Sequence, residues 1–410
     1  MPQVVIVGAG PTGASLALLL AKRGITVSLV EATTDFHRVF RGEGLMPSGL
    51  DALKQMGLSE ILQQIPHREF SAWEVILGKK TLFRVAEPME SNFPPCTLVS
   101  QPPLLTALIE QAKTYSEFEF IQGVPVKDLL RVDNRVAGVK LADGREIFAS
   151  ITIGADGRNS IIRQRAGLHL KKQTKNEKQP KDIDILWFKL ADSPKFISEN
   201  IFYAVSNGDR SFGLFHGAEE GKLHLSWIIF PENKPQDEID QKPAQWAPLI
   251  ASVAPAWMAE HIINHAETIE RPIKLSVVVG RCPSWYAPGV ILLGDAAHPM
   301  SPIRAQGINV ALRDVIVAAN YLVPLLQAKA TGAELDVALA KIQAEREPEI
   351  IRAQQLQSEE ADQAEILRKY NLFRPIMFFG ARLLRQRIRH KWVKRQHEMR
   401  VGVTQVSLRV

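Results

Sequence analysis

The chain has 410 residues, of which 46% are hydrophobic and 23% charged. This composition is typical of a soluble globular protein with room for two or three domains. The net charge of +6 is concentrated near the end, because residues 374–400 contain nine Lys and Arg against one acid, Glu398. The rest of the chain is slightly acidic and has no known nucleic-acid motif, which argues against a nucleic-acid-binding protein.

Cysteine usage and the first residues indicate the compartment. Cys96 and Cys282 are far apart and form no CxxC pair, so a disulfide framework is not expected and a reducing compartment fits. The opening MPQVVIVGAG has no basic region before its apolar run, so we interpret it as a first strand, not a signal peptide. No uninterrupted apolar run approaches the roughly 18 residues of a transmembrane helix. We therefore expect a cytoplasmic protein.

The N-terminal stretch predicts a strand, a glycine-rich turn, a helix and a second strand. A buried strand over 3–7 is followed by Gly8, Gly10 and Gly13, then by a helix over 14–23 and a strand over 25–30 that ends at Glu31. Gly8 allows the tight turn, Gly10 lets the backbone approach a pyrophosphate, and Gly13 lets the helix pack closely on the strand. The helix N-terminus favours phosphate, and an acid at 31 suits a ribose. The pattern predicts a site for FAD or NAD.

The middle of the chain changes from mixed elements to mostly strands. Up to residue 167 we expect helices at 46–56 and 102–113, a hairpin at 73–85, a strand at 97–100, a β-meander at 118–153, and a strand–turn–helix unit at 151–167. Residues 171–181 are polar and lysine-rich, as in a mobile surface loop. Beyond them we expect at least three strands within 183–230, a helix at 243–260, and strands at 273–279 and 289–293. Helices then follow at 308–326, 335–368 and 377–399.

The stretch GDAAHPMSPIRAQGIN, residues 294–309, follows a buried strand. His298 could be a metal ligand, but no second ligand lies at suitable spacing on the same element, so a structural histidine bonded to backbone is favoured and no metal site is predicted. Asp295 could be a catalytic base. An acid directly after a buried strand more often caps the next turn or binds a ligand, and we favour ligand binding.

At these acid–glycine turns the sequence resembles the class A FAD-dependent monooxygenases of the para-hydroxybenzoate hydroxylase fold. The resemblance covers essentially the whole chain and rests on GAGPTG with Glu31, on GADGRNSIIR and on LLGDAAHPMSP…GIN…RD. RGEGLMPSGLDALKQMGL and VSQPPLLTAL agree with it. It implies an α/β fold with a Rossmann-like FAD-binding domain, an inserted, mostly antiparallel sheet domain for the substrate, and C-terminal helices. The expected divisions are 1–72 with 98–168 and 279–326; 73–97 with 169–278; and 327–410.

The resemblance also implies residue roles. The cofactor-binding positions would be Gly8, Gly10, Pro11, Thr12, Gly13, Glu31, Ala32, Arg41, Gln101, Val126, Asp156, Gly294, Asp295, Pro302, Ala305, Gly307, Ile308 and Asn309. Asp295 would accept from the ribityl hydroxyls, Pro302 would lie beside the isoalloxazine, and the helix that opens at Gly307 would face the pyrimidine ring. Asp156 with Arg163 would shape the pyrophosphate side and assist NAD(P)H use.

One position departs from the family. The family often has glycine where this chain has Ala305, preceded by Arg304. A Cβ there adds bulk close to the flavin or forces the loop into right-handed or extended geometry.

The function implied is an FAD-dependent monooxygenase. It would use NAD(P)H as a transient co-substrate, and O₂ through a flavin hydroperoxide, to hydroxylate an aromatic, quinol or polyketide-like molecule. No catalytic residue is identified. Tyr203, His216 and Pro302 are candidates for the substrate pocket, although packing roles are commoner for the first two.

Three rivals share the fold. A flavin halogenase would need a second tryptophan in the segment 225–231, which has one. A reductase of prenyl or membrane lipids fits the basic tail but matches the middle segment poorly. A non-catalytic binding protein is disfavoured by the intact motif at 294–295.

The basic tail has two interpretations. Leu384, Ile388, Trp392 and Met399 lie on one side of the expected helix, and Arg and Lys cover much of the rest. This pattern suits an interfacial helix on an anionic membrane, with residues 374–400 as a peripheral contact on its inner face. Alternatively, the stripe packs on the body and the charges are solvated.

Overall fold

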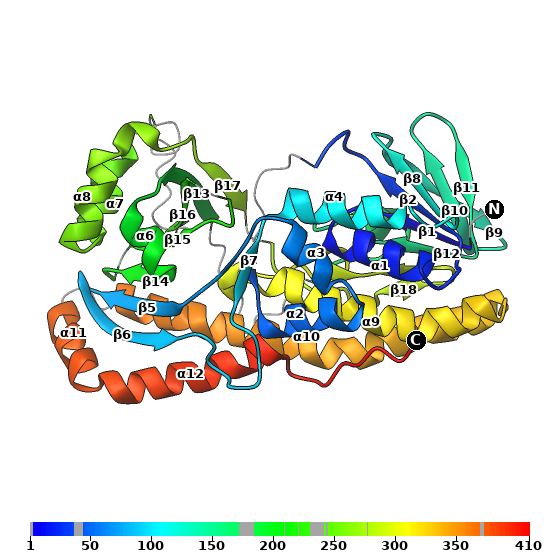
Figure 1. Ribbon diagram of the computed structural model, residues 1–410. Helices are drawn as coiled ribbons and strands as arrows, with labels where there is room; N and C mark the ends of the chain where they lie inside the picture. Colours follow the sequence, from blue (N-terminus) through cyan, green and yellow to red (C-terminus); the bar gives the residue numbers. More distant parts are fainter. Residues whose placement is uncertain are drawn as a thin grey trace.

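The structure is a computed structural model that describes residues 3–36, 44–171, 184–208, 210–219, 221–229, 242, 245–276, 278–369 and 373–410. Within these residues the chain forms two large sheets, one in each half of an elongated molecule, and long C-terminal helices run beneath both (Figure 1). The expected mobile loop at 171–181 lies, except for Lys171, outside the described residues.

The first sheet is mostly parallel and has the order β18-β19-β12-β1-β2-β8. Its strands are β1 (Val4–Val7), β2 (Val27–Glu31), β8 (Phe118–Gln122), β12 (Ile151–Gly154), β18 (Tyr286–Ala287) and β19 (Val290–Leu292). Central β1 is buried at every residue and pairs in parallel with β2 and β12. A strand covered on both faces has to be apolar throughout, which explains its run VVIV.

The predicted continuous meander over 118–153 is wrong. β8 pairs in parallel with β2, and β12 with β1. An antiparallel sheet forms only from β9 (Val126–Val132), β10 (Arg135–Leu141) and β11 (Glu146–Phe148). The turn between β9 and β10 is formed by Asp133 and Asn134, both with positive φ. The apolar pattern of a strand is the same whether its partner strand is near or distant in sequence. The pattern alone therefore could not assign these strands to two different sheets.

Helices cover the parallel sheet. α1 (Pro11–Ala21) packs against α4 (Gln101–Ala112) and α9 (Gln306–Gln327), and α9 also packs on α2 (Pro47–Gln55). Among the described residues one helical stretch, Ile303–Gln327, is long and apolar enough to cross a membrane, but 78% of its most apolar 18-residue window is buried inside the protein. It is the central core helix. Short α3 (Ser59–Gln64) and a small sheet of β3 (Gly44–Leu45), β4 (His67–Glu69) and β7 (Thr97–Val99) lie beside α2 and α4.

The second sheet has the order β17-β13-β16-β15-β14-β5-β6. Its strands are β5 (Ala72–Leu77), β6 (Lys80–Ala86), β13 (Asp184–Ala191), β14 (Ile201–Ser206), β15 (Ser211–His216), β16 (Lys222–Ile229) and β17 (Ile273–Ser276). The region 183–230 thus contains four strands, which agrees with the expectation of at least three. The helix expected at 243–260 is two helices, α7 (Trp246–Val253) and α8 (Ala256–Asn264), because Pro255 interrupts it.

The two faces of the second sheet have different neighbours. One face packs with α7 and α8 in a core that includes Phe188, Leu214, Trp227 and Trp246. The other face carries Trp73, Trp187 and Phe215, and its core includes Ala305 next to α9 and Trp392 from the last helix. The second face therefore looks toward the first half of the molecule.

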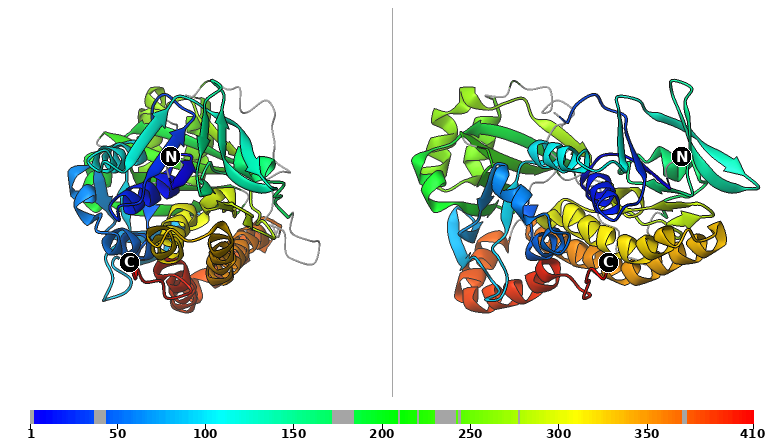
Figure 2. Two further views of the ribbon diagram at one scale, coloured as in Figure 1. Left: turned by 90° about the vertical axis from the view of Figure 1, so that its right-hand side faces the viewer. Right: turned by 45° about the vertical axis from the view of Figure 1, so that its right-hand side comes forward.

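The C-terminal helices run along the underside of the molecule in both views (Figure 2). They are α10 (Gly332–Lys369), α11 (Arg374–Leu383) and α12 (Arg385–Val401). The single helix expected at 377–399 is broken at Leu384, between α11 and α12. The predicted fold class, α/β with an inserted, mostly antiparallel sheet and C-terminal helices, is confirmed.

Candidate functional site

Four predicted site segments meet at one edge of the parallel sheet. Gly8 follows β1, Glu31 ends β2, Asp156 lies two residues beyond β12, and Asp295 lies three beyond β19. Because β1, β2, β12 and β19 run parallel, their carboxyl ends share an edge. The crevice at such an edge is the general ligand site of open α/β sheets.

The three glycines of the first turn fit a closely approaching ligand. A Cβ on Gly10 would meet no atom within 4 Å, so this face of the turn is open. A Cβ on Gly13 would lie 1.9 Å from the carbonyl oxygen of Gly8, so α1 packs directly on the turn. Gly8 has φ +99°, and a Cβ there would lie 2.5 Å from the carbonyl oxygen of Ala155. These constraints are the ones that a pyrophosphate-binding turn imposes.

Glu31 is buried and fixed by three local donors. Its Oε2 accepts from the backbone N–H of Ala9 at 2.8 Å, and its Oε1 accepts from the N–H and hydroxyl of Thr33 at 2.9 and 2.8 Å. The carboxylate therefore couples the end of β2 to the glycine turn. Ala32 beside it is exposed.

Asp156 has one committed oxygen and one uncommitted oxygen. Oδ2 accepts from the N–H groups of Ile161 and Ile162 at 2.7 and 3.1 Å, at the start of α5 (Ile161–Arg165). Oδ1 is buried and has no hydrogen-bond partner in the part of the chain that the structure describes. Burial raises the pKa of this carboxyl group, in opposition to the hydrogen bonds from Ser160 and the α5 backbone. A buried acceptor without a partner next to Gly8 fits a ligand hydroxyl.

Arg163 ties the second turn to the third. Its guanidinium donates to the carbonyl of Ala296 at 2.8 Å and to that of Arg158 at 2.6 Å. The sequence paired Arg163 with Asp156 on the pyrophosphate side, whereas in the structure its guanidinium donates to backbone carbonyls. Arg163 therefore joins the 294–296 turn to the loop that follows β12.

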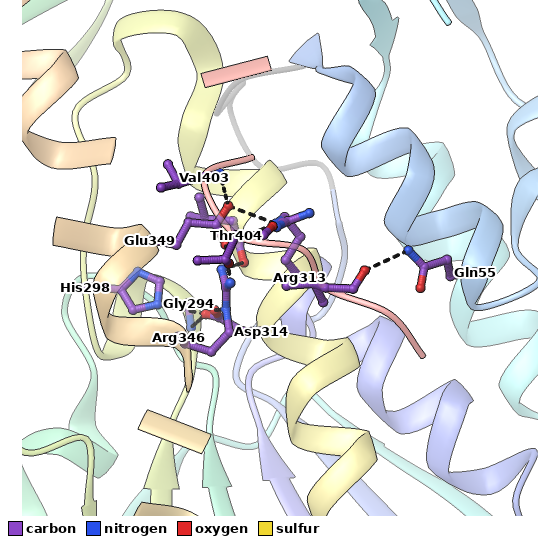
Figure 3. A network of polar contacts seen from close by, with 11 residues as sticks. Gln55, Gly294, His298, Arg313, Asp314, Arg346, Glu349, Val403 and Thr404 are labelled. Atoms are coloured by element: carbon purple, nitrogen blue, oxygen red, sulfur yellow. Dashed lines mark hydrogen bonds and ion pairs between the residues drawn. The ribbon is translucent and has the colours of Figure 1, made fainter. Parts of the chain in front are cut away.

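A buried charged network lies directly behind the 294–295 turn (Figure 3). Asp314 Oδ2 accepts from the backbone N–H of Gly294 at 3.1 Å and lies 2.7 Å from His298 Nε2, and its Oδ1 accepts from Arg346 at 2.8 Å. Arg346 also contacts Glu349, which pairs with Arg313 at 3.0 Å. His298 is thus a structural histidine, as expected. Its ring, however, is bonded to the carboxylate of Asp314 and not to the backbone. The described residues contain no group of three or more potential metal ligands.

The 302–305 turn before α9 keeps left-handed geometry without glycine. Arg304 has φ 60° and Ala305 has φ 50°. The expectation that Ala305 forces right-handed or extended geometry is therefore wrong. The alternative, added bulk close to the flavin, stays a prediction; in the structure the Cβ of Ala305 lies 3.1 Å from where a Cβ on Gly44 would be. Left-handed geometry costs about 1–2 kcal/mol per non-glycine residue, so other contacts have to stabilise it.

Those contacts come from three distant elements. Arg304 Nε donates to Glu360 on α10 at 2.9 Å, and its guanidinium lies 5.3 Å from the ring centroid of Trp73 and 4.9 Å from that of Trp392. Asn309 accepts from the N–H of Met46 at 2.8 Å and donates to the carbonyls of Gly44 and Ala305. Its side chain therefore clamps the turn to β3.

The start of α9 faces the third turn. A Cβ on Gly307 would lie 3.7 Å from Asp295 Oδ1. The N-cap residue of this helix, Ala305, makes no side-chain capping bond, and the first turn contains no acid. Pro302 is exposed, and Ile308 is half-buried. A helix N-terminus directs N–H groups and a partial positive charge at the space in front of it, which favours an acceptor there.

Other predicted cofactor residues are more scattered. Pro11 and Thr12 begin α1, and a Cβ on Gly294 would lie 2.6 Å from the hydroxyl oxygen of Thr12, so the first and third turns touch. Gln101 is the half-buried first residue of α4, and Val126 is buried at the start of β9. Arg41 lies outside the described residues.

The two substrate-pocket candidates on the second sheet have internal partners. Tyr203 packs against Phe196 and Trp257 in the helix-covered core, and its hydroxyl contacts Glu199. That side of the sheet faces away from Ala305. Tyr203 is therefore a packing residue in this structure, which corrects its assignment to the substrate pocket. His216 is buried with Nε2 2.7 Å from Asp192 and Nδ1 2.8 Å from the carbonyl of Gly217. Both of its ring nitrogens are engaged at the end of β15.

The sequence missed an aromatic surface on the opposite face. His224 on β16 is buried, with its ring centroid 6.1 Å from that of Trp187 and 5.6 Å from that of Phe215. Burial, and then the charges of Lys189 and His216, lower the pKa of His224 to about 3. The sequence places Phe215 and His224 on two separate strands. It does not show that these strands pair and bring the two residues opposite each other. This face packs against the turn that contains Ala305.

Comparison with known proteins identifies the family. The model of an FAD binding domain family matches residues 1–351. The 6-methylpretetramide 4-monooxygenase of Streptomyces rimosus is 30% identical over 364 residues, covering 87% of this chain and 82% of that protein. The 6-hydroxynicotinate 3-monooxygenase of Pseudomonas fluorescens is 25% identical, covering 78% of this chain and 82% of that protein.

Solved structures agree on the fold. PqsL of Pseudomonas aeruginosa in complex with 2-aminobenzoylacetate superposes with a TM-score of 0.78 at 23% identity, over 89% of this chain and 97% of that one. The p-nitrophenol 4-monooxygenase PnpA of Pseudomonas putida DLL-E4 gives 0.77 at 16% identity, over 99% of both chains. These relatives support the monooxygenase prediction and not the lipid reductase or the non-catalytic alternative. The chain is a member of the class A FAD-dependent monooxygenases, with FAD as cofactor and with the NAD(P)H dependence typical of that family.

Proposed function

We propose that this enzyme hydroxylates an aromatic or polyketide-like small molecule with O₂ and NAD(P)H. The observation that carries the proposal is the aromatic face of the second sheet, which packs on the 302–305 turn beside the start of α9. Trp73, Trp187 and Phe215 supply flat apolar surface there, which suits a planar ring. The relative from Streptomyces rimosus is named for a polyketide-type substrate and that from Pseudomonas fluorescens for a hydroxypyridine acid.

The residues present fit FAD. The open face of Gly10 and the start of α1 would receive the pyrophosphate, and Glu31 the adenosine ribose. Asp295 would accept from the ribityl chain, and the uncapped start of α9 would donate to the pyrimidine ring and stabilise negative charge there. The uncommitted Oδ1 of Asp156 would accept a ligand hydroxyl. When bound, FAD supplies hydride acceptance from NAD(P)H and activation of O₂.

The chain's own groups would orient the substrate and exclude water. His224 stays neutral across the physiological range because its pKa lies at about 3. It would therefore offer a polar contact without charge inside the aromatic face. The aromatic side chains around it keep water away from the reacting ring.

The division into an FAD unit, a substrate unit and a helical region, at the boundaries predicted from the sequence, is part of this proposal. The membership of the two large sheets supports it. A cytoplasmic location is likewise proposed, supported by the burial of the one long apolar helix among the described residues.

The test is spectroscopic and kinetic. Purified protein reconstituted with FAD should show a bound-flavin spectrum, and its oxidation of NADH or NADPH should accelerate with a matching phenol, hydroxypyridine or polyketide-type aromatic. Oxygen uptake and a product heavier by one oxygen atom should follow in proportion. Absence of flavin binding would overturn the cofactor site, whereas NAD(P)H oxidation coupled to saturation of a prenyl chain would overturn the hydroxylase.

A further inference from the structure

The outer face of α11 is apolar and uncovered. Five large side chains along it are between 54% and 71% exposed, namely Phe373, Ile376, Phe379, Leu383 and Leu384. At 100° per residue they span an arc of about 140°. A contiguous exposed face of this kind marks an interaction site more often than scattered exposed residues do.

The opposite face of the same helix fixes its orientation. Phe378 and Ala381 pack into the core on the second sheet. A Cβ on Gly78, at the tip of the β5–β6 hairpin, would lie 2.5 Å from the Phe378 ring. The helix is therefore anchored on one side and presents the apolar arc on the other, at the end of the molecule farthest from the parallel sheet (Figure 1).

The surroundings of this face are strongly cationic. Residues 373–397 contain no acid and eight cations: Arg374, Arg382, Arg385, Arg387, Arg389, Lys391, Lys394 and Arg395. Arg385, Arg387, Arg389 and Lys391 are exposed at the start of α12, directly after the apolar arc. No ion pair among the described residues involves these four.

The structure also corrects the stripe expected to contact a membrane. Trp392 and Met399 are buried on the body, 7% and 2% exposed, and Ile388 packs beside Trp392. The packing interpretation therefore holds for most of that stripe, and Leu384 alone of its four members belongs to the exposed face. The uncovered surface is α11 and the start of α12.

Charge decides between the possible occupants. A second copy placed symmetrically on this face would bring two sets of cations together, which is unfavourable. Nucleic acid would leave the aromatic and aliphatic arc exposed to water. An anionic lipid surface satisfies both components, because headgroups attract the cations while apolar side chains enter the interface.

We propose that α11 and the start of α12 form a peripheral docking surface for anionic membranes. Ile376, Phe379 and Leu383 insert at the level of the headgroups, and Arg385, Arg387 and Arg389 contact lipid phosphates. The surface lies on the substrate half of the molecule, so the docked enzyme presents that half to the lipid. This proposal does not depend on the substrate or on turnover.

Vesicle sedimentation with the full-length holoenzyme tests the proposal. The probes are phosphatidylcholine vesicles with and without about one third phosphatidylglycerol, in about 0.1 M and about 1 M salt. We expect the protein to pellet several-fold more with anionic vesicles, and high salt to remove most of that difference. Equal pelleting with neutral and anionic vesicles, or none above the vesicle-free control, would overturn the proposal.

Two triple variants separate the contributions. Ile376→Ser/Phe379→Ser/Leu383→Ser removes the arc, and Arg385→Gln/Arg387→Gln/Arg389→Gln removes charge; each should lower anionic partitioning, the second on the order of a hundredfold. Matched controls are Val132→Ser/Ile263→Ser/Val337→Ser, which are 53%, 47% and 57% exposed elsewhere, and Lys22→Gln/Lys54→Gln/Lys341→Gln.

The controls should retain wild-type partitioning, and circular dichroism and flavin absorbance should show all variants folded. Loss in the controls equal to that in the α11 variants would refute the assignment. If the arc variant instead converts a sedimenting dimer to a monomer without changing lipid binding, the occupant is a second copy and the proposal fails.

Discussion

At the scale of single residues, two glycines three positions apart have opposite constraints. The space around the Gly10 Cβ position is empty, whereas that of Gly13 is occupied by the Gly8 carbonyl oxygen at 1.9 Å. Gly10→Ala should therefore fold with unchanged thermal stability but bind FAD at least tenfold more weakly, because the methyl group enters the space proposed for the pyrophosphate. Flavin fluorescence titration and thermal unfolding measure the two effects.

Gly13→Ala is the matched comparison. It should lose ~1–3 kcal/mol of stability through overpacking of α1 on the turn. Unchanged FAD affinity in Gly10→Ala would place the pyrophosphate elsewhere.

His224 predicts a pH dependence of stability. Its folded pKa is about 3 because it is buried, while an unfolded histidine titrates near 6.5. Below about pH 6.5 this histidine is protonated in the unfolded chain but stays neutral in the folded chain. The free energy of unfolding therefore falls by up to ~1.4 kcal/mol per pH unit as the pH decreases toward 3.

Denaturant unfolding between pH 7 and pH 4.5 tests this expectation. His224→Gln should give a shallower loss of stability than wild type, whereas His390→Gln, at an exposed position on α12, should not. Parallel pH profiles of His224→Gln and wild type would contradict the assignment.

At the scale of elements, the 302–305 turn depends on α10 and α12. Arg304 binds Glu360 and stacks near Trp73 and Trp392, and it lowers the pKa of Glu360. Arg304→Met should cost ~3 kcal/mol, because Glu360 is left largely buried without its main partner. The double variant Arg304→Met/Glu360→Gln should cost less than the sum of the two single changes.

Chemical denaturation of the four proteins in this cycle gives the coupling energy. Arg304→Gly should be more stable than Arg304→Met by about 1 kcal/mol, because glycine accepts the left-handed backbone without strain. Additive single effects would mean that the ion pair does not stabilise the turn.

The elements also show what the sequence could predict. The β1–α1–β2 unit was predictable, because each glycine has a local task and the apolar runs are continuous. The partner of β8 and the existence of β14 were not predictable from the sequence, because strand pairing is set by distant segments. The left-handed geometry of Ala305 was not predictable, because it depends on the contact of Arg304 with Glu360, 56 residues away in sequence. Arg163 could not be assigned to the Ala296 carbonyl for the same reason.

At the scale of the whole molecule, the last residues connect parts that are distant in sequence. Val403 donates to Glu349 at 3.1 Å, Leu408 to Gln55 at 2.7 Å, and Arg409 to Asn320 at 2.7 Å, all through backbone N–H groups. These contacts join α10, α2 and α9. Glu349 belongs to the network behind the Gly294 turn (Figure 3), so the C-terminal segment is linked to the proposed cofactor site.

Deletion of residues 403–410 should therefore destabilise the enzyme by several kcal/mol, because it leaves buried acceptors unsatisfied at ~1–3 kcal/mol each. Deletion of residues 409–410 alone should cost less, since it leaves the Glu349 contacts in place. Thermal unfolding with and without FAD measures both losses. The prediction fails if the longer deletion leaves stability unchanged while the charge-removing Asp314→Asn still destabilises the enzyme. The charged network behind the Gly294 turn would then be stable without the C-terminal segment, which would only cover it.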